Sequence, residues 1–160
     1  MIKVGDSLPE ATFVAMSGSG PAEKKAGDVF SGRKVALFAV PGAFTPTCHN
    51  NHLPGFLANA DALKAKGVDA IVCLSVNDIF VLDAWAKATG SDGAIEFIAD
   101  GNGDFVKAIG LDFDGSPRGM GIRSQRFAML VDDGVVKMLN VEDAPGTAVT
   151  SSADALLEQI

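Results

Sequence analysis

The sequence predicts an α/β protein with a central mixed β-sheet flanked by helices. Apolar runs typical of buried parallel strands alternate with segments of helical periodicity along most of the chain. Near the C-terminal end, two strand-like segments are joined by an Asp-Gly turn signal, which predicts an antiparallel hairpin. A last helix-like segment closes the chain. Alternating strands and helices followed by a hairpin favour a mixed sheet between helical layers.

The length and composition fit one ordinary globular domain. The chain has 160 residues, and we expect residues 1–160 to form a single domain with a sizeable core. Hydrophobic residues make up 48% of the chain, which excludes a disordered protein. The formal charge of −7 argues against a nucleic-acid partner. No apolar run approaches the roughly 20 residues of a membrane span, and no basic amphipathic helix indicates a membrane surface.

The first half of the chain predicts a loop, a strand and a long helix. Residues 16–28 contain Gly, Ser and Pro and are expected to be a surface loop. The continuous apolar run 34–40 predicts a buried strand. Residues 46–66 predict a helix with Gly67 just beyond its end. The apolar residues of this helix at helical spacing are Leu53, Phe56, Leu57, Ala60 and Leu63.

Residues 69–76 predict a second buried strand, and the helix after it runs to about Thr89. Asn77 or Asp78 is the expected N-cap of this helix. The residues expected to face the core are Val81, Ala84, Trp85 and Ala88.

Short elements complete the pattern. Residues 95–99 predict a strand and residues 103–110 a short helix. Residues 126–141 predict two strands joined by a tight turn at Asp133 and Gly134. Residues 151–159 predict a helix with Ser151 or Ser152 as its cap. This order of elements is compatible with a thioredoxin-like architecture.

The two cysteines indicate a reducing environment. Two cysteines do not form a disulfide scaffold for a domain of this size, and the N-terminal residues show no secretory signal. We therefore expect free thiols and a cytoplasmic location. Cys73 lies among aliphatic residues of a predicted strand, so we expect it to be a structural core residue.

Cys48 stands in the stretch VPGAFTPTCHNNHLPGF, residues 40–56, after a strand and a Pro-Gly turn. If Thr45 caps the next helix and Pro46 is its first residue, Cys48 lies in the first helical turn. Free N–H groups and the positive end of the helix dipole favour a thiolate there. The same position also fits a buried, inert cysteine.

The histidines of this stretch allow two further hypotheses. Cys48 and His52 share one helix face, as a thiol hydrolase would require, but no third group orients the base. Cys48, His49 and His52 form a weak metal-site candidate because no fourth ligand completes it. For His49 we expect only surface polarity and local hydrogen bonds. Pro54 predicts a kink or distortion near residues 50–54.

Three arginines precede or begin the strand-like run near residue 126. Arg126 stands at the start of that strand, so we expect it to be partly buried and to need an anionic partner, which a thiolate would supply. Arg118 and Arg123 are expected to be solvated surface residues.

With these residues in view, the chain resembles the peroxiredoxins. PGAFTPTC carries their Pro-x-x-x-Thr-x-x-Cys pattern, and the longer stretch 40–56 resembles the type II, peroxiredoxin-5-like branch. The resemblance continues through LKAKGVDAIVCLSVND, GIRSQRFAMLVDDGVVKMLNVE and the opening IKVGDSLP. It implies a thioredoxin fold and the reduction of hydrogen peroxide and organic hydroperoxides, with no cofactor and no metal.

Carried over residue by residue, the resemblance implies four site residues. Cys48 matches the peroxidatic cysteine, which peroxide oxidises to sulfenic acid. Thr45 matches the threonine that hydrogen-bonds the peroxide and the thiolate. Pro41 matches the proline that shields the site from water. Arg126 matches the arginine that stabilises the thiolate and polarises the peroxide.

The resemblance leaves the regenerating thiol to be inferred. Some type II members carry a resolving cysteine near GTAVTSSAD, where this chain has Thr150, Ser151 and Ser152. We therefore expect a one-cysteine cycle with an external thiol, glutathione with glutaredoxin first and thioredoxin second. The resemblance also implies a homodimer. The rival hypothesis is a peroxide-sensing or holdase-type redox protein with little turnover.

Overall fold

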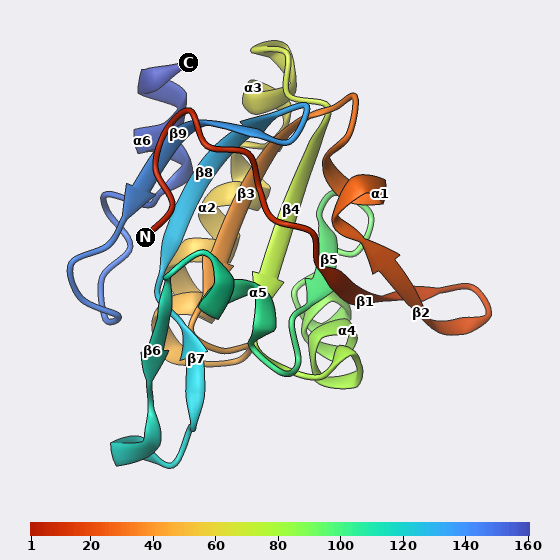
Figure 1. The fold of residues 1–160 in the computed structure, drawn as a ribbon, viewed down its shortest axis with the longest axis vertical. Helices are drawn as coiled ribbons and strands as arrows, with labels where there is room; N and C mark the ends of the chain where they lie inside the picture. Colours follow the sequence, from red (N-terminus) through yellow and green to blue (C-terminus); the bar gives the residue numbers. More distant parts are fainter.

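The computed structural model describes all residues 1–160 and contains a twisted seven-stranded sheet with helices on both faces (Figure 1). The strand order is β2-β1-β5-β4-β3-β8-β9, and a separate two-stranded sheet pairs β6 with β7. The sheet is mixed, since some of its strand pairs are parallel and others antiparallel. The predicted α/β fold with a central mixed sheet is confirmed.

The centre of the sheet consists of strands predicted from their apolar runs. β3 (Lys34–Val40) is parallel to β4 (Ala70–Ser75), and β4 is parallel to β5 (Glu96–Ala99). On the other side of β3, β8 (Phe127–Asp132) and β9 (Val135–Val141) form the predicted antiparallel hairpin. Buried strands covered on both faces read as continuous apolar runs, which explains why the sequence marks β3 and β4 clearly.

The prediction of a surface loop at residues 16–28 is wrong. This part of the chain forms the end of β1 (Thr12–Ser17), all of β2 (Gly20–Lys25) and the start of the short helix α1 (Ala26–Phe30). β1 pairs with β5 through Val14 and with β2 along its whole length. β2 is an edge strand, and its residues are largely solvent-exposed, so no apolar alternation marks it in the sequence.

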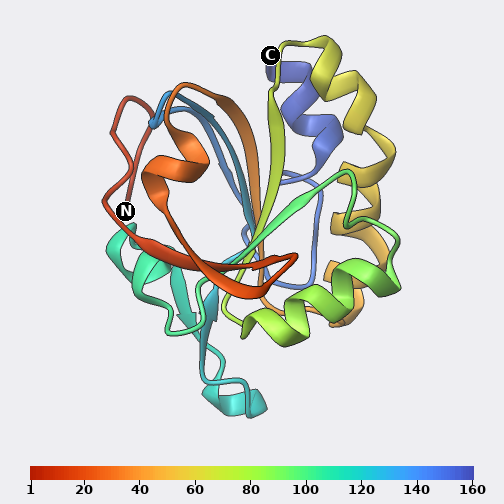
Figure 2. The same ribbon diagram turned by 90° about the vertical axis from the view of Figure 1, so that its right-hand side faces the viewer.

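Helices divide between the two faces of the sheet, as Figure 2 shows. One face carries four helices and a π-helical turn: η1 (Cys48–His52), α2 (Leu53–Ala58), α3 (Ala60–Ala65), α4 (Ile79–Ala88) and α6 (Ala153–Gln159). The opposite face is covered by α1 and α5 (Asp104–Ala108). Alternate residues of β3 enter the two cores, with Phe38 on the side of Cys48 and Leu37 on the other.

The core-facing side predicted for α4 is wrong except at Trp85. Val81, Ala84 and Ala88 are exposed, and the buried residues are Ile79, Leu82, Trp85 and Ala86. The buried stripe begins at Ile79, the first helical residue, because the Asp78 carboxylate accepts the Val81 N–H and fixes the helix start there.

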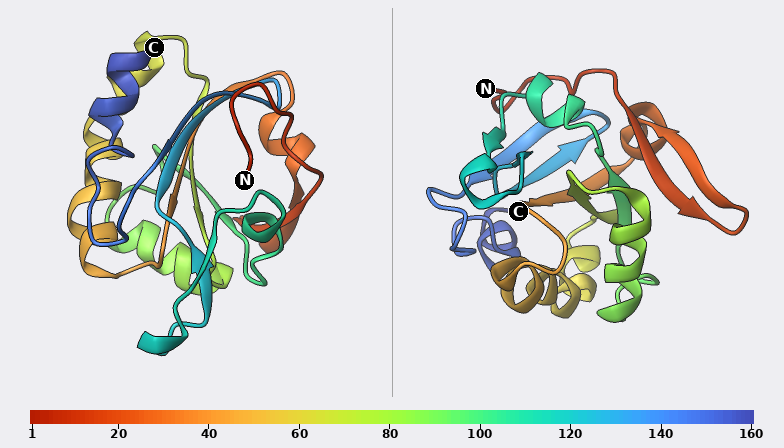
Figure 3. Two further views of the ribbon diagram at one scale, coloured as in Figure 1. Left: turned by 60° about the vertical axis from the view of Figure 1, so that its left-hand side comes forward. Right: turned by 90° about the horizontal axis from the view of Figure 1, so that it is seen from below.

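The predicted turn of the β8–β9 hairpin and the predicted cap of α6 are confirmed, and another hairpin was missed. Asp133 and Gly134 both have positive φ in the β8–β9 turn, and Ser152 caps α6. The missed hairpin consists of β6 (Asp112–Asp114), the 3-10 turn η2 (Ser116–Arg118) and β7 (Ile122–Ser124). It projects from the body of the molecule, as Figure 3 shows. None of the helices has the length and apolar character that crossing a membrane requires.

Candidate active site

The register of the sheet brings Arg126 beside the Pro-Gly turn. In the antiparallel pair of β3 and β8, Ala39 lies opposite Phe127. Arg126 directly precedes Phe127, and Pro41 directly follows the last residue of β3, so both lie at the same end of this strand pair. The helical segment that carries Cys48 begins at that end of the sheet.

Cys48 begins a π-helical turn. The N–H of Leu53 donates to the carbonyl of Cys48, five residues earlier, so the turn is wider than an α-helical one. Pro54 follows at once and has no N–H, and its ring would clash with the carbonyl of Asn50 in a regular α-helix. The distortion predicted near residues 50–54 is therefore confirmed as a π-helical turn.

Arg126 is the direct partner of the Cys48 sulfur. Cys48 is completely buried, and Arg126 is 2% exposed. The Arg126 Nη2 donates to Cys48 Sγ over 3.0 Å. The carbonyl of Pro145 accepts from Arg126 Nε at 3.2 Å and from Nη2 at 3.0 Å, which fixes the plane of the guanidinium. A fixed cationic donor thus lies in direct contact with the buried sulfur.

His52 is 1% exposed and holds Arg126 from the other side. Its Nε2 lies 2.8 Å from the Ser151 carbonyl, which can only accept, so Nε2 carries the proton. Its Nδ1 then accepts from Arg126 Nη1 at 3.1 Å. Burial lowers the pKa of His52 to about 4, and the Arg126 charge adds to this, so the ring is neutral at pH 7.

Neither histidine has the partners that the hydrolase and metal hypotheses required. His52 hydrogen-bonds Arg126 and Ser151, with Arg126 rather than His52 on the Cys48 sulfur. His49 was expected to have surface polarity and local contacts, but it is half-buried. Its Nδ1 accepts from Trp85 Nε1 at 3.0 Å, so this partner comes from α4 rather than from its own helix.

Thr45 stands at the predicted helix start but does not cap it as predicted. Its backbone carbonyl accepts the His49 N–H, as an N-cap carbonyl does. Its hydroxyl, however, donates to the Gly42 carbonyl at 2.7 Å and accepts no helical N–H. Phe44, with φ of 64°, makes the sharp turn that brings Thr45 back toward Gly42. The Thr45 oxygen is therefore left as an acceptor at the helix start.

Pro41 is buried and is held by a second arginine. Arg123 Nη1 lies 3.4 Å from the Pro41 carbonyl, and Arg123 Nε donates to the Met120 carbonyl. Arg123 is half-buried, so the prediction that it is a solvated surface residue is wrong. The missed β6–β7 hairpin is the reason, because it folds Arg123 back onto the Pro-Gly turn. Arg118 is exposed, as predicted.

A cavity of about 410 Å³ opens onto this group of residues. Three of the four site residues from the sequence, Pro41, Thr45 and Arg126, line it, and Arg126 connects it to the buried Cys48 sulfur. The other lining residues belong to the helix start, the β6–β7 hairpin and the loop after β9: Pro46, Thr47, Phe113, Asp114, Gly115, Pro117, Arg118, Met120, Pro145 and Gly146.

Cys73 lies inside β4, in the same core cluster as Cys48, and is completely buried. Burial raises the pKa of the Cys73 thiol well above its ordinary value. It does not line the cavity, and the two cysteines are not joined by a disulfide. This environment is that of a structural cysteine.

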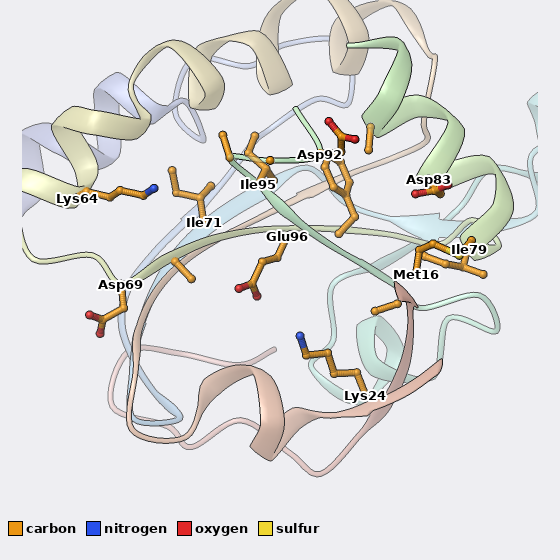
Figure 4. Close-up of a pocket in the computed structure, with 16 residues that line it drawn as sticks. Met16, Lys24, Lys64, Asp69, Ile71, Ile79, Asp83, Asp92, Ile95 and Glu96 are labelled. Carbon is orange, nitrogen blue, oxygen red and sulfur yellow. The ribbon is translucent and has the colours of Figure 1, made fainter. Parts of the chain in front are cut away.

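A different pocket of about 340 Å³ lies between the β1–β2 edge and helices α3 and α4 (Figure 4). Lysine side chains such as Lys64 and acidic side chains such as Asp69 and Glu96 line it together. None of the residues around Cys48 lines this pocket, whereas Arg126 lines the cavity of about 410 Å³.

The family is shown by sequence comparison. A family model described as Redoxin matches residues 3–157. Peroxiredoxin-2E-2, chloroplastic, of Oryza sativa subsp. japonica is 48% identical over 99% of this chain and 72% of the rice protein. This chain is a type II peroxiredoxin. Peroxiredoxins are thiol-dependent peroxidases, and this activity is therefore that of the chain.

Solved structures agree with this assignment. Reduced Prx3 of Vibrio vulnificus in complex with hydrogen peroxide is 48% identical, with a TM-score of 0.94 over 99% of both chains. Peroxiredoxin 5 of Alvinella pompejana is 36% identical, with a TM-score of 0.86 over 99% of this chain and 97% of its own. The thioredoxin-like fold of this peroxiredoxin is thereby confirmed. The rice relative is named as chloroplastic, and the cytoplasmic location expected here stays a prediction.

Two polar residues of the site were missed by the sequence analysis. His52 was considered only as a base or a metal ligand, although its place four residues after Cys48 on one helix face does indicate a role beside the sulfur. Glu142, which follows β9, organises the loop that holds Arg126. No local signal in the sequence marks Glu142, because its partners are defined only by the fold.

Proposed function

We propose that this peroxiredoxin reduces hydrogen peroxide and organic hydroperoxides through Cys48, with Thr45, Arg126 and Pro41 as the other site residues. One observation carries the proposal: the guanidinium of Arg126 touches the Cys48 sulfur at 3.0 Å and also lines the cavity. A peroxide in that cavity would meet a fixed cation that is in direct contact with the buried sulfur.

The reaction follows from these contacts. The Cys48 thiolate attacks the terminal peroxide oxygen, so an S–O bond forms while the O–O bond breaks. Sulfur is oxidised by two electrons to sulfenic acid, and the leaving alkoxide or hydroxide takes up a proton to give an alcohol or water. Arg126 meets the negative charge that develops on the leaving oxygen. The Thr45 oxygen would accept a hydrogen bond from the peroxide O–H, and Pro41 would keep water from this side.

The size and lining of the cavity support organic hydroperoxides as substrates. At about 410 Å³ the cavity has room for far more than hydrogen peroxide. Phe113, Met120, Pro117 and Pro145 are among its lining residues and offer apolar surface to an alkyl or aryl group. The reacting oxygen would lie near Arg126 and the apolar group near the β6–β7 hairpin.

Steady-state peroxidase assays of Cys48→Ser and Arg126→Lys test the assignment. Cys48→Ser is expected to abolish turnover, because a serine hydroxyl does not replace the thiolate. Arg126→Lys keeps the positive charge but loses the planar guanidinium group that contacts both the sulfur and the Pro145 carbonyl. We therefore expect kcat/KM to fall at least tenfold. Peroxidase activity in Cys48→Ser would show that the site is wrong. Rapid oxidation of Cys48 without turnover would favour a peroxide sensor.

We further propose a one-cysteine cycle with an external thiol. Glutathione would attack the Cys48 sulfenic acid, releasing water and forming a mixed disulfide that glutaredoxin then reduces. Thioredoxin is the second candidate. The buried position of Cys73 inside β4 supports this cycle, because a Cys48–Cys73 disulfide would require the core to rearrange.

Mass spectrometry after one equivalent of hydrogen peroxide tests the cycle. In the presence of glutathione we expect a glutathione adduct on Cys48, and Cys73→Ser is expected to keep its activity with glutathione and glutaredoxin. A Cys48–Cys73 disulfide at high yield within one chain would contradict the one-cysteine cycle. Turnover with thioredoxin but not with glutathione and glutaredoxin would identify the second donor.

The expected homodimer would use an exposed apolar patch beside the site. Phe44 is 49% exposed and Phe80 66% exposed, and Val81 lies next to Phe80 on α4. The ring of Phe44 stacks on His49 and lies near Trp85, one turn of α4 away from Val81. An exposed patch of large apolar side chains fits an association surface. A second copy of this chain is the proposed partner.

A further inference from the structure

A buried carboxylate outside the four site residues organises the loop after β9. Glu142 is 8% exposed and directly follows β9. Its Oε1 accepts from the Thr147 hydroxyl and from the N–H groups of Val149 and Thr150. Its Oε2 accepts from the N–H of Ser151 at 2.8 Å and from the Ser151 hydroxyl at 2.6 Å. One carboxylate thus gathers five donors from residues 147–151.

The same loop supplies the carbonyl groups that hold the site. The Pro145 carbonyl accepts two hydrogen bonds from the Arg126 guanidinium. The Ser151 carbonyl accepts from His52, whose other ring nitrogen accepts from Arg126. Both contacts that orient the guanidinium therefore lead back to the segment that Glu142 fixes.

Glu142 is also bound to Arg126 through the sheet. The N–H of Glu142 donates to the carbonyl of Arg126 at 2.9 Å, at the end of the β8–β9 ladder. The carboxylate and the guanidinium are thus anchored on neighbouring strands. A shift of the loop relative to β8 would move the two carbonyl acceptors away from a guanidinium whose backbone stays in place.

We propose that Glu142 is a positioning residue for the reaction of peroxide at Cys48. It acts by fixing loop 143–151, whose carbonyl groups aim Arg126 at the sulfur. The inference rests on the proposed role of Cys48 and Arg126 and adds a residue that touches neither peroxide nor sulfur.

The charge of Glu142 suits this role. Burial raises the pKa of Glu142, but the hydrogen bonds from the Ser151 hydroxyl and from the N–H groups of Ser151, Val149 and Thr150 outweigh it and hold the pKa at about 2. Glu142 is therefore an anion at every pH at which a peroxidase would be assayed. A neutral amide in its place would turn an NH₂ group toward N–H and O–H donors, and part of the loop would lose its acceptor.

Glu142→Gln, compared with Asp143→Asn, tests the proposal. Asp143 is the next residue, is exposed and makes no side-chain hydrogen bond, so its variant controls for the loss of one negative charge in the same loop. Rapid-quench mass spectrometry would measure the rate constant of Cys48 oxidation by hydrogen peroxide. We expect Glu142→Gln to be at least tenfold slower than wild type and Asp143→Asn to match wild type. We also expect the pH profile of Cys48 alkylation by iodoacetamide to move to higher pH in Glu142→Gln only.

A double-mutant cycle separates positioning from general stability. If Glu142 acts through Arg126, the double variant Glu142→Gln/Arg126→Gln will be no slower than Arg126→Gln alone. Additive losses in this cycle would overturn the proposal, as would a folded Glu142→Gln enzyme with the wild-type rate constant and pH profile.

A milder variant keeps the test valid if Glu142→Gln fails to fold. Ser151→Ala removes only the hydroxyl donor to Glu142 and leaves the Ser151 carbonyl on His52. We expect a smaller loss of the oxidation rate constant in the same direction, and an unchanged rate constant in Ser151→Ala would then overturn the proposal. A wild-type enzyme whose Cys48 does not react with peroxide would instead contradict the proposed function itself.

Discussion

At the scale of single residues, one buried histidine makes the stability of the folded protein depend on pH. His52 is neutral in the folded protein because burial lowers its pKa from 6.5 to about 4. Between these pH values the unfolded chain binds a proton that the folded chain does not. The contribution of His52 to stability is therefore complete above about pH 6.5 and is lost as the pH falls toward 4.

His52→Gln tests this dependence on pH. A glutamine amide can donate to Ser151 and accept from Arg126 without titrating, so most of the geometry should survive. We expect the free energy of unfolding of wild type to fall between pH 6.5 and 4 more steeply than that of His52→Gln. The expected difference in slope is up to about 1.4 kcal/mol per pH unit, the value for one proton. Urea unfolding at several pH values would measure it, and equal slopes would show that His52 is not the titrating group.

Glu142 also stabilises the folded state less as the pH falls, but in a lower pH range than His52. Its pKa is lowered from 4.5 to about 2, so its contribution to stability is present above about pH 4.5 and is lost as the pH falls toward 2. The two groups thus weaken the folded state in successive acidic windows. At neutral pH His52 is uncharged and Glu142 is an anion, the states in which both hold the loop after β9.

At the scale of elements, the π-helical turn and the β6–β7 hairpin shape the site. The turn at Cys48–His52 places Cys48 and His52 on either side of the Arg126 guanidinium. The hairpin supplies Phe113 and Met120 to the cavity wall and bends Arg123 onto Pro41. The π-helical turn could be predicted from Pro54, which is a local signal. The β6–β7 hairpin could not be predicted in this way, because its strands are short and have little periodicity.

Phe113→Ala tests the contribution of the hairpin to substrate choice. Phe113 is half-buried and lines the cavity, so its loss removes apolar contact with the organic part of a hydroperoxide. We expect kcat/KM for cumene hydroperoxide to fall roughly tenfold, a loss of about 1.4 kcal/mol, while the value for hydrogen peroxide changes little. Ile122→Ala is the matched control, because Ile122 lies on the same hairpin outside the cavity lining. Equal losses of kcat/KM for both peroxides would show that the hairpin does not recognise the organic group.

At the scale of the whole molecule, the sheet separates two cores and leaves one apolar patch exposed. Alternate side chains of β3 enter the two cores, and Cys48 belongs to the one beneath α2, α4 and α6. Phe44 and Phe80 stay exposed, and the ring of Phe44 lies near Trp85 of this core. The proposed dimer would cover them and bring a second copy close to each cavity.

Phe80→Arg tests the proposed dimer. A charged side chain at this position would disfavour the packing of two apolar patches, and the fold should tolerate it because Phe80 is 66% exposed. We expect wild type to sediment as a dimer at micromolar concentration and Phe80→Arg to sediment mainly as a monomer. Val4→Arg, at an exposed apolar residue near the N-terminus, should leave the dimer intact. A wild-type monomer, or a dimer unaffected by Phe80→Arg, would contradict the proposed interface.

Much of the fold and part of the site could be predicted from the sequence. The central strands, the helix that begins at Pro46, its distortion before Pro54 and the Asp133–Gly134 turn all follow from local patterns. The predictions that were wrong lie at exposed or short elements. The residues of β2 are largely solvent-exposed, and the buried face of α4 was predicted to include Val81, which is exposed. Segments that face solvent show little hydrophobic periodicity in the sequence. Their secondary structure therefore depends on contacts with other parts of the fold.

By itself the sequence determined that this chain is a type II peroxiredoxin fold with Cys48 in the first turns of a helix. The resemblance of its motifs to the family indicated the peroxiredoxin fold, whereas local propensity and turn chemistry placed Cys48 at the helix start, because their physical causes lie within a few residues. The sequence also predicted Arg126, 78 residues away, as a partner of the sulfur, but only the tertiary structure showed that His52 and Glu142 hold its guanidinium there. Strand register and buried hydrogen bonds set these contacts, and both depend on residues distant in the chain.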